Sequence, residues 1–460
     1  MPISKDEARS SADSSAPTGA LPRRIGLWSA IAVCIGSTIG SGIFRSPSGI
    51  AEKIPGPLPL LAVWAVGGVF ALCGALTLAE VASALPQTGG FYAFLREGWG
   101  RLYAFLFGWG QLSVVRAAAL GAIAITFAEY FLRVLGFDPR VAPYDQYSRY
   151  VAAGAIVLTA SMNIAGVKFA TALTNLTTVA KYGGLVFIVI IALAIGLPKT
   201  GGHFTPWVPP GSFVLSSAGL ALVSALWAYD GWGDVSYVAG EVVDPQRNLP
   251  RALIGGTLAV ILIYSLANLA YLSVLSVDEI RQSKLVAADV AERVIGRPGV
   301  IIVSVTVMLS TFGTLSAVLL TSPRVLFAMA DDGMLFKQVA RVHPRFKTPY
   351  VAIAIVATLG FIFVLLRSFE QLADAFVIAM LPFYAGGVAT VYRLRRRPGY
   401  VPKFKTPGYP VVPAIFLLSV FYLLFNALST PTSRVATAKI LALLAAGIPI
   451  WWIFLRKPRK

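Results

Sequence analysis

The length, composition and charge of this chain exclude most classes of soluble protein. Its 460 residues are 57% hydrophobic and only 13% charged, with a mean hydropathy of +0.73, whereas a soluble domain carries about 25% charged residues. The net charge of +18 is spread over short loops and tails between apolar runs, so we expect no nucleic-acid partner. The sequence instead predicts a chain whose main partner is the lipid bilayer.

Apolar stretches along the chain predict an all-α polytopic membrane protein with about twelve transmembrane helices, since each helix needs about 20 apolar residues. The first 24 residues (1–24) are polar and are expected to form a disordered cytosolic tail. The predicted spans cover residues 25–53, 58–84, 102–132, 150–166, 170–197, 213–240, 250–275, 299–328, 349–366, 370–392, 410–428 and 436–455. A short amphipathic helix is expected over 278–297, between the seventh and eighth spans.

Lysine and arginine are distributed unequally between the two sides of these spans. The side that carries both termini holds roughly twice as many as the other, and such loops stay in the cytosol. We therefore expect both termini in the cytosol and the chain in a plasma (inner) membrane. Cys34 and Cys73 lie inside apolar runs, so they predict neither a disulfide framework nor a metal site, and no cofactor is expected.

Two of the predicted spans contain glycine clusters at mid-membrane depth, where a helix normally satisfies its own backbone. The first span reads GSTIGSG over 36–42, and the sixth reads AYDGWGD over 228–234. Interrupted helices at corresponding positions of two halves indicate a transporter binding site. The implied architecture is two inverted five-helix repeats, 25–197 and 213–392, followed by two additional helices over 410–455 and a cytosolic tail over 456–460.

The chemistry of a broken helix suits a zwitterionic amino acid. The outgoing half-helix offers free N–H groups and a positive dipole end to a carboxylate. The incoming half-helix offers free carbonyl groups to an ammonium. The alternative interpretation of the first cluster is a close packing face of small residues between helices.

The residues around both breaks resemble the L-type amino-acid transporter branch of the amino acid–polyamine–organocation (APC) superfamily. The resemblance rests on GSTIGSGIFRSPSGI (36–50), WAVGGVFALCGALTLAEVASALPQTGGFYAFL (64–95), ALWAYDGWGDVSYVAGEVVDPQRNLPRAL (225–253) and TSPRVLFAMADDGMLFKQVARVHPRFKTPYVAI (321–353). It implies the LeuT-type fold with broken first and sixth helices. It further implies sodium-independent transport of neutral amino acids by alternating access, as an exchanger.

The same resemblance implies roles for individual residues. The substrate carboxylate falls on Ser41 and Gly42, with Gly40 allowing close approach. The amine meets backbone carbonyls near Thr38, Trp227 and Asp230, and Trp227 covers the substrate as a gate. The full set of implied substrate-binding residues is Thr38, Ile39, Gly40, Ser41, Gly42, Trp227, Tyr229 and Asp230.

Ionisable residues inside spans are costly, so each is expected to have a partner or a task. The resemblance implies that Lys181 reaches the first break and the eighth helix, where its ammonium fills the space of a sodium ion; the alternative is a lysine that extends to the membrane interface. Glu80, Glu241 and Arg324, near cytosolic helix ends, are candidates for an inner gate or for plain structural ion pairs.

The sequence does not assign a single role to two further charged side chains. Asp230 has three candidate roles: holding the amine, carrying a proton, or capping the second half of the sixth helix. Arg45, just after the first break, stands where many relatives carry an apolar residue, and its role is not predicted.

Other classes of function fit the sequence less well. The sequence shows no nucleophile paired with a base, no metal-ligand cluster and no phosphate-binding loop, so it does not indicate an enzyme. It also shows no symmetric filter, so it does not indicate a channel. A sodium-coupled symporter would use Ser310 and Thr311, but Lys181 should displace the ion. A proton-coupled symporter and a cationic amino acid or polyamine antiporter of the same fold remain alternatives.

A partner subunit is not expected. Animal relatives attach to a heavy subunit through a cysteine after the third helix. The corresponding loop here, 133–149, has no cysteine. The sequence therefore predicts no disulfide-linked heavy subunit.

Overall fold

The computed structural model describes residues 23–454 except 88, 167–180, 213, 332, 336 and 347. Within these residues every regular element is a helix, and the one strand-like contact is an isolated bridge between Ile25 and Val242. The predicted all-α class is therefore confirmed. The α-helices are α2 (Leu27–Thr38), α3 (Gly42–Ala51), α4 (Pro57–Ala84), α5 (Phe91–Trp99), α6 (Arg101–Gly110), α7 (Arg116–Val134), α8 (Tyr144–Ala165), α10 (Leu197–Thr200), α11 (Leu215–Tyr229), α12 (Pro245–Val274), α13 (Val277–Gln282), α14 (Val286–Ile295), α15 (Arg297–Asp331), α16 (Tyr350–Leu366), α17 (Phe369–Leu394), α18 (Val411–Ser429), α19 (Pro431–Ala445) and α20 (Gly447–Phe454). Short π or 3-10 segments are η1 (Gln111–Val115), η2 (Ala192–Gly196), η3 (Asp234–Glu241) and η4 (Lys337–Ala340).

Many of these helices can cross a membrane. Among the described residues, 8 are long and apolar enough, and α2 with α3 forms one further bent span. The part of the fifth predicted span that is described is the helix Lys181–Thr200. α16 is apolar but shorter, with 17 residues. The chain is thus a multi-pass membrane protein, as predicted.

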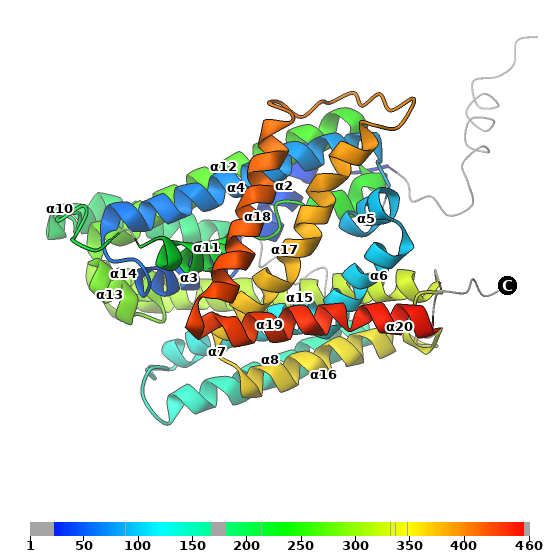
Figure 1. Ribbon diagram of the computed structural model, residues 1–460. Helices are drawn as coiled ribbons and strands as arrows, with labels where there is room; N and C mark the ends of the chain where they lie inside the picture. Colours follow the sequence, from blue (N-terminus) through cyan, green and yellow to red (C-terminus); the bar gives the residue numbers. More distant parts are fainter. Residues whose placement is uncertain are drawn as a thin grey trace, which may run out of the picture.

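The helices gather into two groups that α17 connects (Figure 1). α2 and α4 lie against α12 on one side of the molecule, while α7, α8, α15 and α16 pack together on the other. α17 contacts both α4 and α7, and so joins the two groups. α3 packs on α11. α11 also contacts α4, so both α2 and α3 lie beside the first group of helices.

The predicted amphipathic helix over 278–297 is wrong in one respect, because the structure divides it into α13 and α14. Ser276 and Glu279 form a reciprocal capping box that starts α13, and residues 283–285 separate the two helices. α14 buries its apolar face and ends at Gly296, whose φ of 69° lies in the left-handed region that glycine tolerates. The capping box is a local signal that the sequence contained.

Candidate functional site

The first predicted break is present in the structure. α2 ends at Thr38 and α3 begins at Gly42, and the two helices are bent by 42°. Among the described residues no acceptor takes a hydrogen bond from the N–H groups of Gly40, Ser41 or Gly42. A Cβ added at Gly40 would meet nothing within 4 Å. The start of α3 therefore offers free donors next to open space, which is the arrangement that binds an anion at a helix N-terminus.

The second break lies against the first. α11 ends at Tyr229, and the chain resumes as the 3-10 segment η3 at Asp234. Gly231 has a φ of 101°, and a Cβ there would stand 2.7 Å from the carbonyl carbon of Ser37. On the other side of the contact, a Cβ at Gly42 would stand 2.4 Å from the Cα of Ala228. Glycine is thus required for the two broken helices to touch, so the packing interpretation of the cluster holds for Gly42, and its role in binding stays a prediction.

These two contacts predict different outcomes for two alanine substitutions in the same break. Gly42→Ala should lower the thermal midpoint of the purified protein, because overpacking against backbone costs about 1–3 kcal/mol. Gly40→Ala is the matched control and should leave the midpoint unchanged, because its methyl group enters open space. The measurement is thermal unfolding in detergent, followed by tryptophan fluorescence. Equal midpoints for the two variants would contradict the close contact of α3 and α11.

A tyrosine that sequence reasoning missed joins the two breaks. The hydroxyl of Tyr264, on α12, lies 2.9 Å from the carbonyl oxygen of Thr38 and 2.9 Å from that of Ala228. Its single proton is donated to one carbonyl at a time. Each carbonyl has a second lone pair, so Thr38 can still accept from a ligand. The signal was a tyrosine inside a span, whose hydroxyl needs a partner there.

Lys181 reaches the end of α2 just before the first break, as the family resemblance implies. Its Nζ atom donates to the carbonyl oxygen of Gly36 at 2.8 Å, and the residue is only 6% exposed. The same helix packs tightly on α15, since a Cβ at Gly184 would lie 2.1 Å from the Thr306 side chain. The predicted reach of Lys181 to the eighth helix is not among its described hydrogen bonds. The ammonium thus sits at the end of α2, and the next turn of its helix contacts α15 at Thr306.

Trp227 and Asp230 both contact α17, the tenth predicted span, none of whose residues the sequence placed in the site. The Trp227 ring packs edge-on against Phe369 and Phe376, with centroids 6.1 Å and 5.0 Å away. The Asp230 carboxylate accepts a hydrogen bond from the hydroxyl of Tyr384. Asp230 directly follows α11, which ends at Tyr229, and Gly233 precedes η3 with no side-chain cap. The capping role considered for Asp230 is therefore wrong.

Tyr229 turns toward α4 and α12. Its ring centroid lies 5.9 Å from Trp64 and 5.1 Å from Tyr264. It also lines, with Asp230 and Tyr384, a cavity of about 10 Å³, which is room for about one water molecule. Tyr229 therefore supports the position of Tyr264 from behind the two breaks.

The three candidates for an inner gate, Glu80, Glu241 and Arg324, do not lie in one place. Glu80 is fully buried and forms a bidentate ion pair with Arg395, at 2.8 and 2.6 Å. It also accepts from the backbone N–H of Thr406 at 2.6 Å, so it fixes the segment between α17 and α18. The carbonyl oxygen of Glu241 accepts from the N–H groups of Arg24 and Ile25. The side chain of Arg324, in α15, lies outside the described residues.

Arg45 gains a clear structural role. Its guanidinium is 3% exposed and lies 3.1 Å from Glu129 on α7 and 2.9 Å from Glu370 on α17. It also lies over the ring of Phe369, 4.9 Å from the centroid. Because Phe369 packs on Trp227, Arg45 joins α3 to the helices that support the predicted substrate cover.

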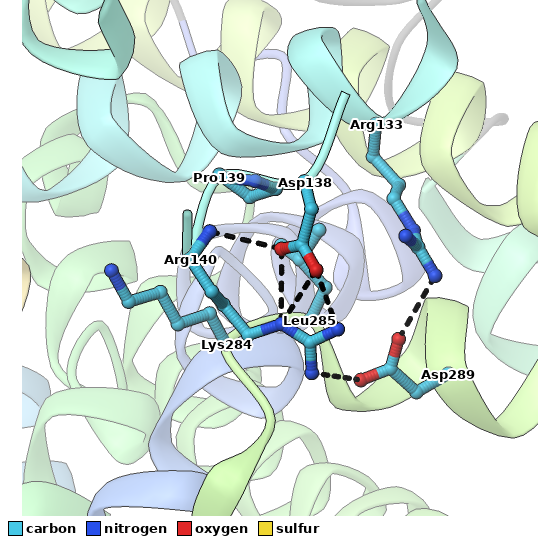
Figure 2. A pocket seen from close by; sticks show the side chains of 7 residues that line it. All are labelled: Arg133, Asp138, Pro139, Arg140, Lys284, Leu285 and Asp289. Atoms are coloured by element: carbon cyan, nitrogen blue, oxygen red, sulfur yellow. Dashed lines mark hydrogen bonds and ion pairs between the residues drawn. The ribbon is translucent and has the colours of Figure 1, made fainter. Parts of the chain in front are cut away.

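A more exposed group of charges lies at the end of α7 (Figure 2). Asp138 and Arg140 pair at 2.8 Å, and Asp289 of α14 is 3.4 Å from Arg133 and 3.8 Å from Arg140. The hydrogen bond from Arg140 holds the pKa of Asp138 below its usual value, whereas burial raises the pKa of Asp289. These pairs fasten the loop after α7 to α14, and solvent screens them more than it screens Arg45.

The apolar helices and the paired breaks are the architecture expected of a membrane transporter. The sequence model of a family described as amino acid permease matches residues 25–454. The chain therefore belongs to the amino acid permease family, and its resemblance to the L-type branch of the APC superfamily is confirmed.

Three relatives illustrate this membership. The chain is 31% identical to the serine/threonine exchanger SteT of Bacillus subtilis (strain 168), over 94% of this chain and 97% of that protein. It is 31% identical to the human b(0,+)-type amino acid transporter 1, over 90% and 85% of the two chains. It is 32% identical to the large neutral amino acids transporter small subunit 2 of Rattus norvegicus, over 94% and 81%.

Proposed function

We propose that this chain exchanges neutral amino acids across the plasma membrane by alternating access, without sodium. The observation that carries the proposal is the contact between the two broken helices. Free N–H groups at the start of α3 suit the substrate carboxylate, and carbonyl groups at the ends of α2 and α11 suit its amine. The relatives named above include a serine/threonine exchanger and a large neutral amino acids transporter subunit, which supports this substrate class.

Different residues of the two breaks would bind different groups of the substrate. Ser41 and Gly42 bind the carboxylate through their N–H groups, with Ile39 and Gly40 shaping the approach. The amine meets the carbonyls of Thr38 and of the Trp227–Asp230 end of α11. Trp227 covers the bound substrate with α17 behind it, and Tyr229 supports the break. Such a site recognises the α-carboxylate and α-amino groups of the substrate, and the surrounding helices contact the substrate side chain.

Sodium independence would rest on Lys181. Its ammonium donates to Gly36 at the end of α2, the place where a cation would otherwise have to neutralise carbonyl oxygens. A fixed positive charge there makes a bound sodium ion unnecessary and repels one that approaches. The Lys181 ammonium would therefore supply the positive charge that a coupling sodium ion would otherwise bring to this place.

The remaining parts of the proposal concern architecture and surroundings. We infer two inverted repeats, 25–197 and 213–392, with the helices over 410–455 added, because the breaks fall in the first and sixth spans. The distribution of lysine and arginine supports cytosolic termini. Cys34 and Cys73 are both buried, which supports a chain with no disulfide-linked heavy subunit.

The test is counterflow in proteoliposomes that contain the purified full-length chain. Uptake of radiolabelled serine, alanine and leucine is measured with and without unlabelled amino acid inside, in sodium and in choline, with and without a pH gradient. Uptake that requires internal substrate and ignores both sodium and pH is expected. Uptake into empty vesicles driven by a sodium or proton gradient would replace the exchange proposal by symport, and uptake of lysine or a polyamine alone would replace the neutral substrate class.

A further inference from the structure

A basic groove lies outside the two breaks, where α12 begins. It has a volume of about 590 Å³. Its lining includes Arg247 and Arg251 on the first turns of α12, with Lys403 and Phe404 from the segment between α17 and α18. Within the described part of the chain, no carboxylate lies within 4.0 Å of any of these three cations. One acidic residue, Asp244, also lines the groove, so the lining stays positively charged overall.

The groove continues into an apolar stripe along the same helix. The two arginines are spaced i, i+4, and the next positions on that face are Ile254 and Gly255, which line the groove floor. The stripe then runs on through three leucines that are 48%, 61% and 38% exposed, at Leu258, Leu262 and Leu266. α12 is long and apolar enough to span the membrane, so this exposed stripe faces hydrocarbon. One helix face thus carries positive charge at the membrane surface and leucine below it.

From this juxtaposition we propose that the groove binds the phosphate headgroup of an anionic phospholipid, whose acyl chains lie along the leucine stripe of α12. The phosphate would lie between Arg247, Arg251 and Lys403. Basic pockets at a membrane surface recognise such headgroups, and arginine suits phosphate because its donors form a planar fork. Phe404 would cover the glycerol region. The proposal does not depend on the transported substrate.

A space at Gly255 allows the site to be blocked without changing any charge. A Cβ added at Gly255 would meet nothing within 4 Å, so Gly255→Leu should fill the groove floor and leave the fold intact. Leucine is also a better helix former than glycine. Gly154, on α8, has equally open surroundings, and Gly154→Leu is therefore the matched control.

The experiment counts lipids bound to the full-length protein by native mass spectrometry, with phosphatidylglycerol or phosphatidylcholine of the same acyl chains. The wild type should retain phosphatidylglycerol in preference to phosphatidylcholine. The combined variant Arg247→Gln, Arg251→Gln, Lys403→Gln should bind phosphatidylglycerol about 100-fold more weakly, because each basic residue near the surface contributes about a factor of five. Gly255→Leu should also weaken binding, and Gly154→Leu should not.

A second charge variant separates a site from general attraction. Arg341, Arg345 and Arg396 are exposed and lie outside the groove lining, and replacing all three by glutamine removes the same charge. Equal loss of lipid in both combined variants would overturn the site, as would equal retention of phosphatidylcholine by the wild type. If glycerol 3-phosphate, at the same concentration as the lipid, displaced all of the bound phosphatidylglycerol, the groove would be a site for soluble phosphate. That result would overturn the lipid assignment. Thermal midpoints measured without lipid identify any variant that fails to fold. If the combined charge variant fails to fold, lipid binding by Gly255→Leu tests the proposal in its place.

Discussion

Replacing Lys181 by methionine should reduce exchange at least tenfold while leaving most of the protein folded. The ammonium donates to the Gly36 carbonyl at 2.8 Å in a site that is almost closed to solvent. A hydrogen bond to a charged group is worth about 1.5–3 kcal/mol, or about 10–150-fold in an equilibrium. Methionine keeps the length and apolar character of the side chain but leaves the end of α2 without this partner. The measurement is the initial rate of counterflow in proteoliposomes.

The matched control lies on the same helix. Lys199 donates to the carbonyl oxygen of Val294 at 3.0 Å, far from both breaks in sequence. Lys199→Met should therefore retain exchange, although it loses a similar hydrogen bond. Wild-type exchange by Lys181→Met would remove the lysine from the mechanism. A fall in its thermal midpoint that accounts for all lost activity would make its role purely structural.

The parts of the site that could be predicted are those with a local sequence signal. Clustered glycines in an apolar span predicted both breaks, because few other arrangements explain them. Lys181 was predicted from its place in a span together with the family resemblance. The capping box that begins α13 was also local, but it was not used, and the helix over 278–297 was predicted as continuous.

The parts that were missed depend on which way a helix faces. Tyr264 and Tyr384 look like ordinary packing aromatics in sequence, and only the fold shows that their hydroxyls meet the breaks. Arg45 and Glu129 are 84 positions apart, and nothing in either segment specifies the pairing. Glu80 likewise finds Arg395, on a segment that follows α17, rather than another gate candidate.

The largest effect on stability is expected from Arg45→Met. The arginine and Glu129 have only 3% and 4% of their side chains exposed, so the substitution leaves a carboxylate buried without its partner. Breaking a buried pair in this way costs about 3–5 kcal/mol. Arg140→Met is the control, since Arg140 and Asp138 are 40% and 31% exposed and such pairs are worth about 0–1 kcal/mol. Thermal unfolding in detergent should place Arg45→Met well below the wild type and Arg140→Met close to it.

The double variant Arg45→Met, Glu129→Leu separates the two ways in which Arg45 can act. If the loss comes from the unpaired Glu129 carboxylate, removing that carboxylate as well should recover most of the midpoint, because two apolar groups replace a buried pair at little cost. If the loss comes from the cation over Phe369 and from the ion pair with Glu370, the double variant should stay as unstable as the single one. Recovery is the expected result, because Glu129 is buried whereas Glu370, at 39% exposed, can still be solvated. The same comparison in counterflow would show whether α3 needs this ion pair to support exchange.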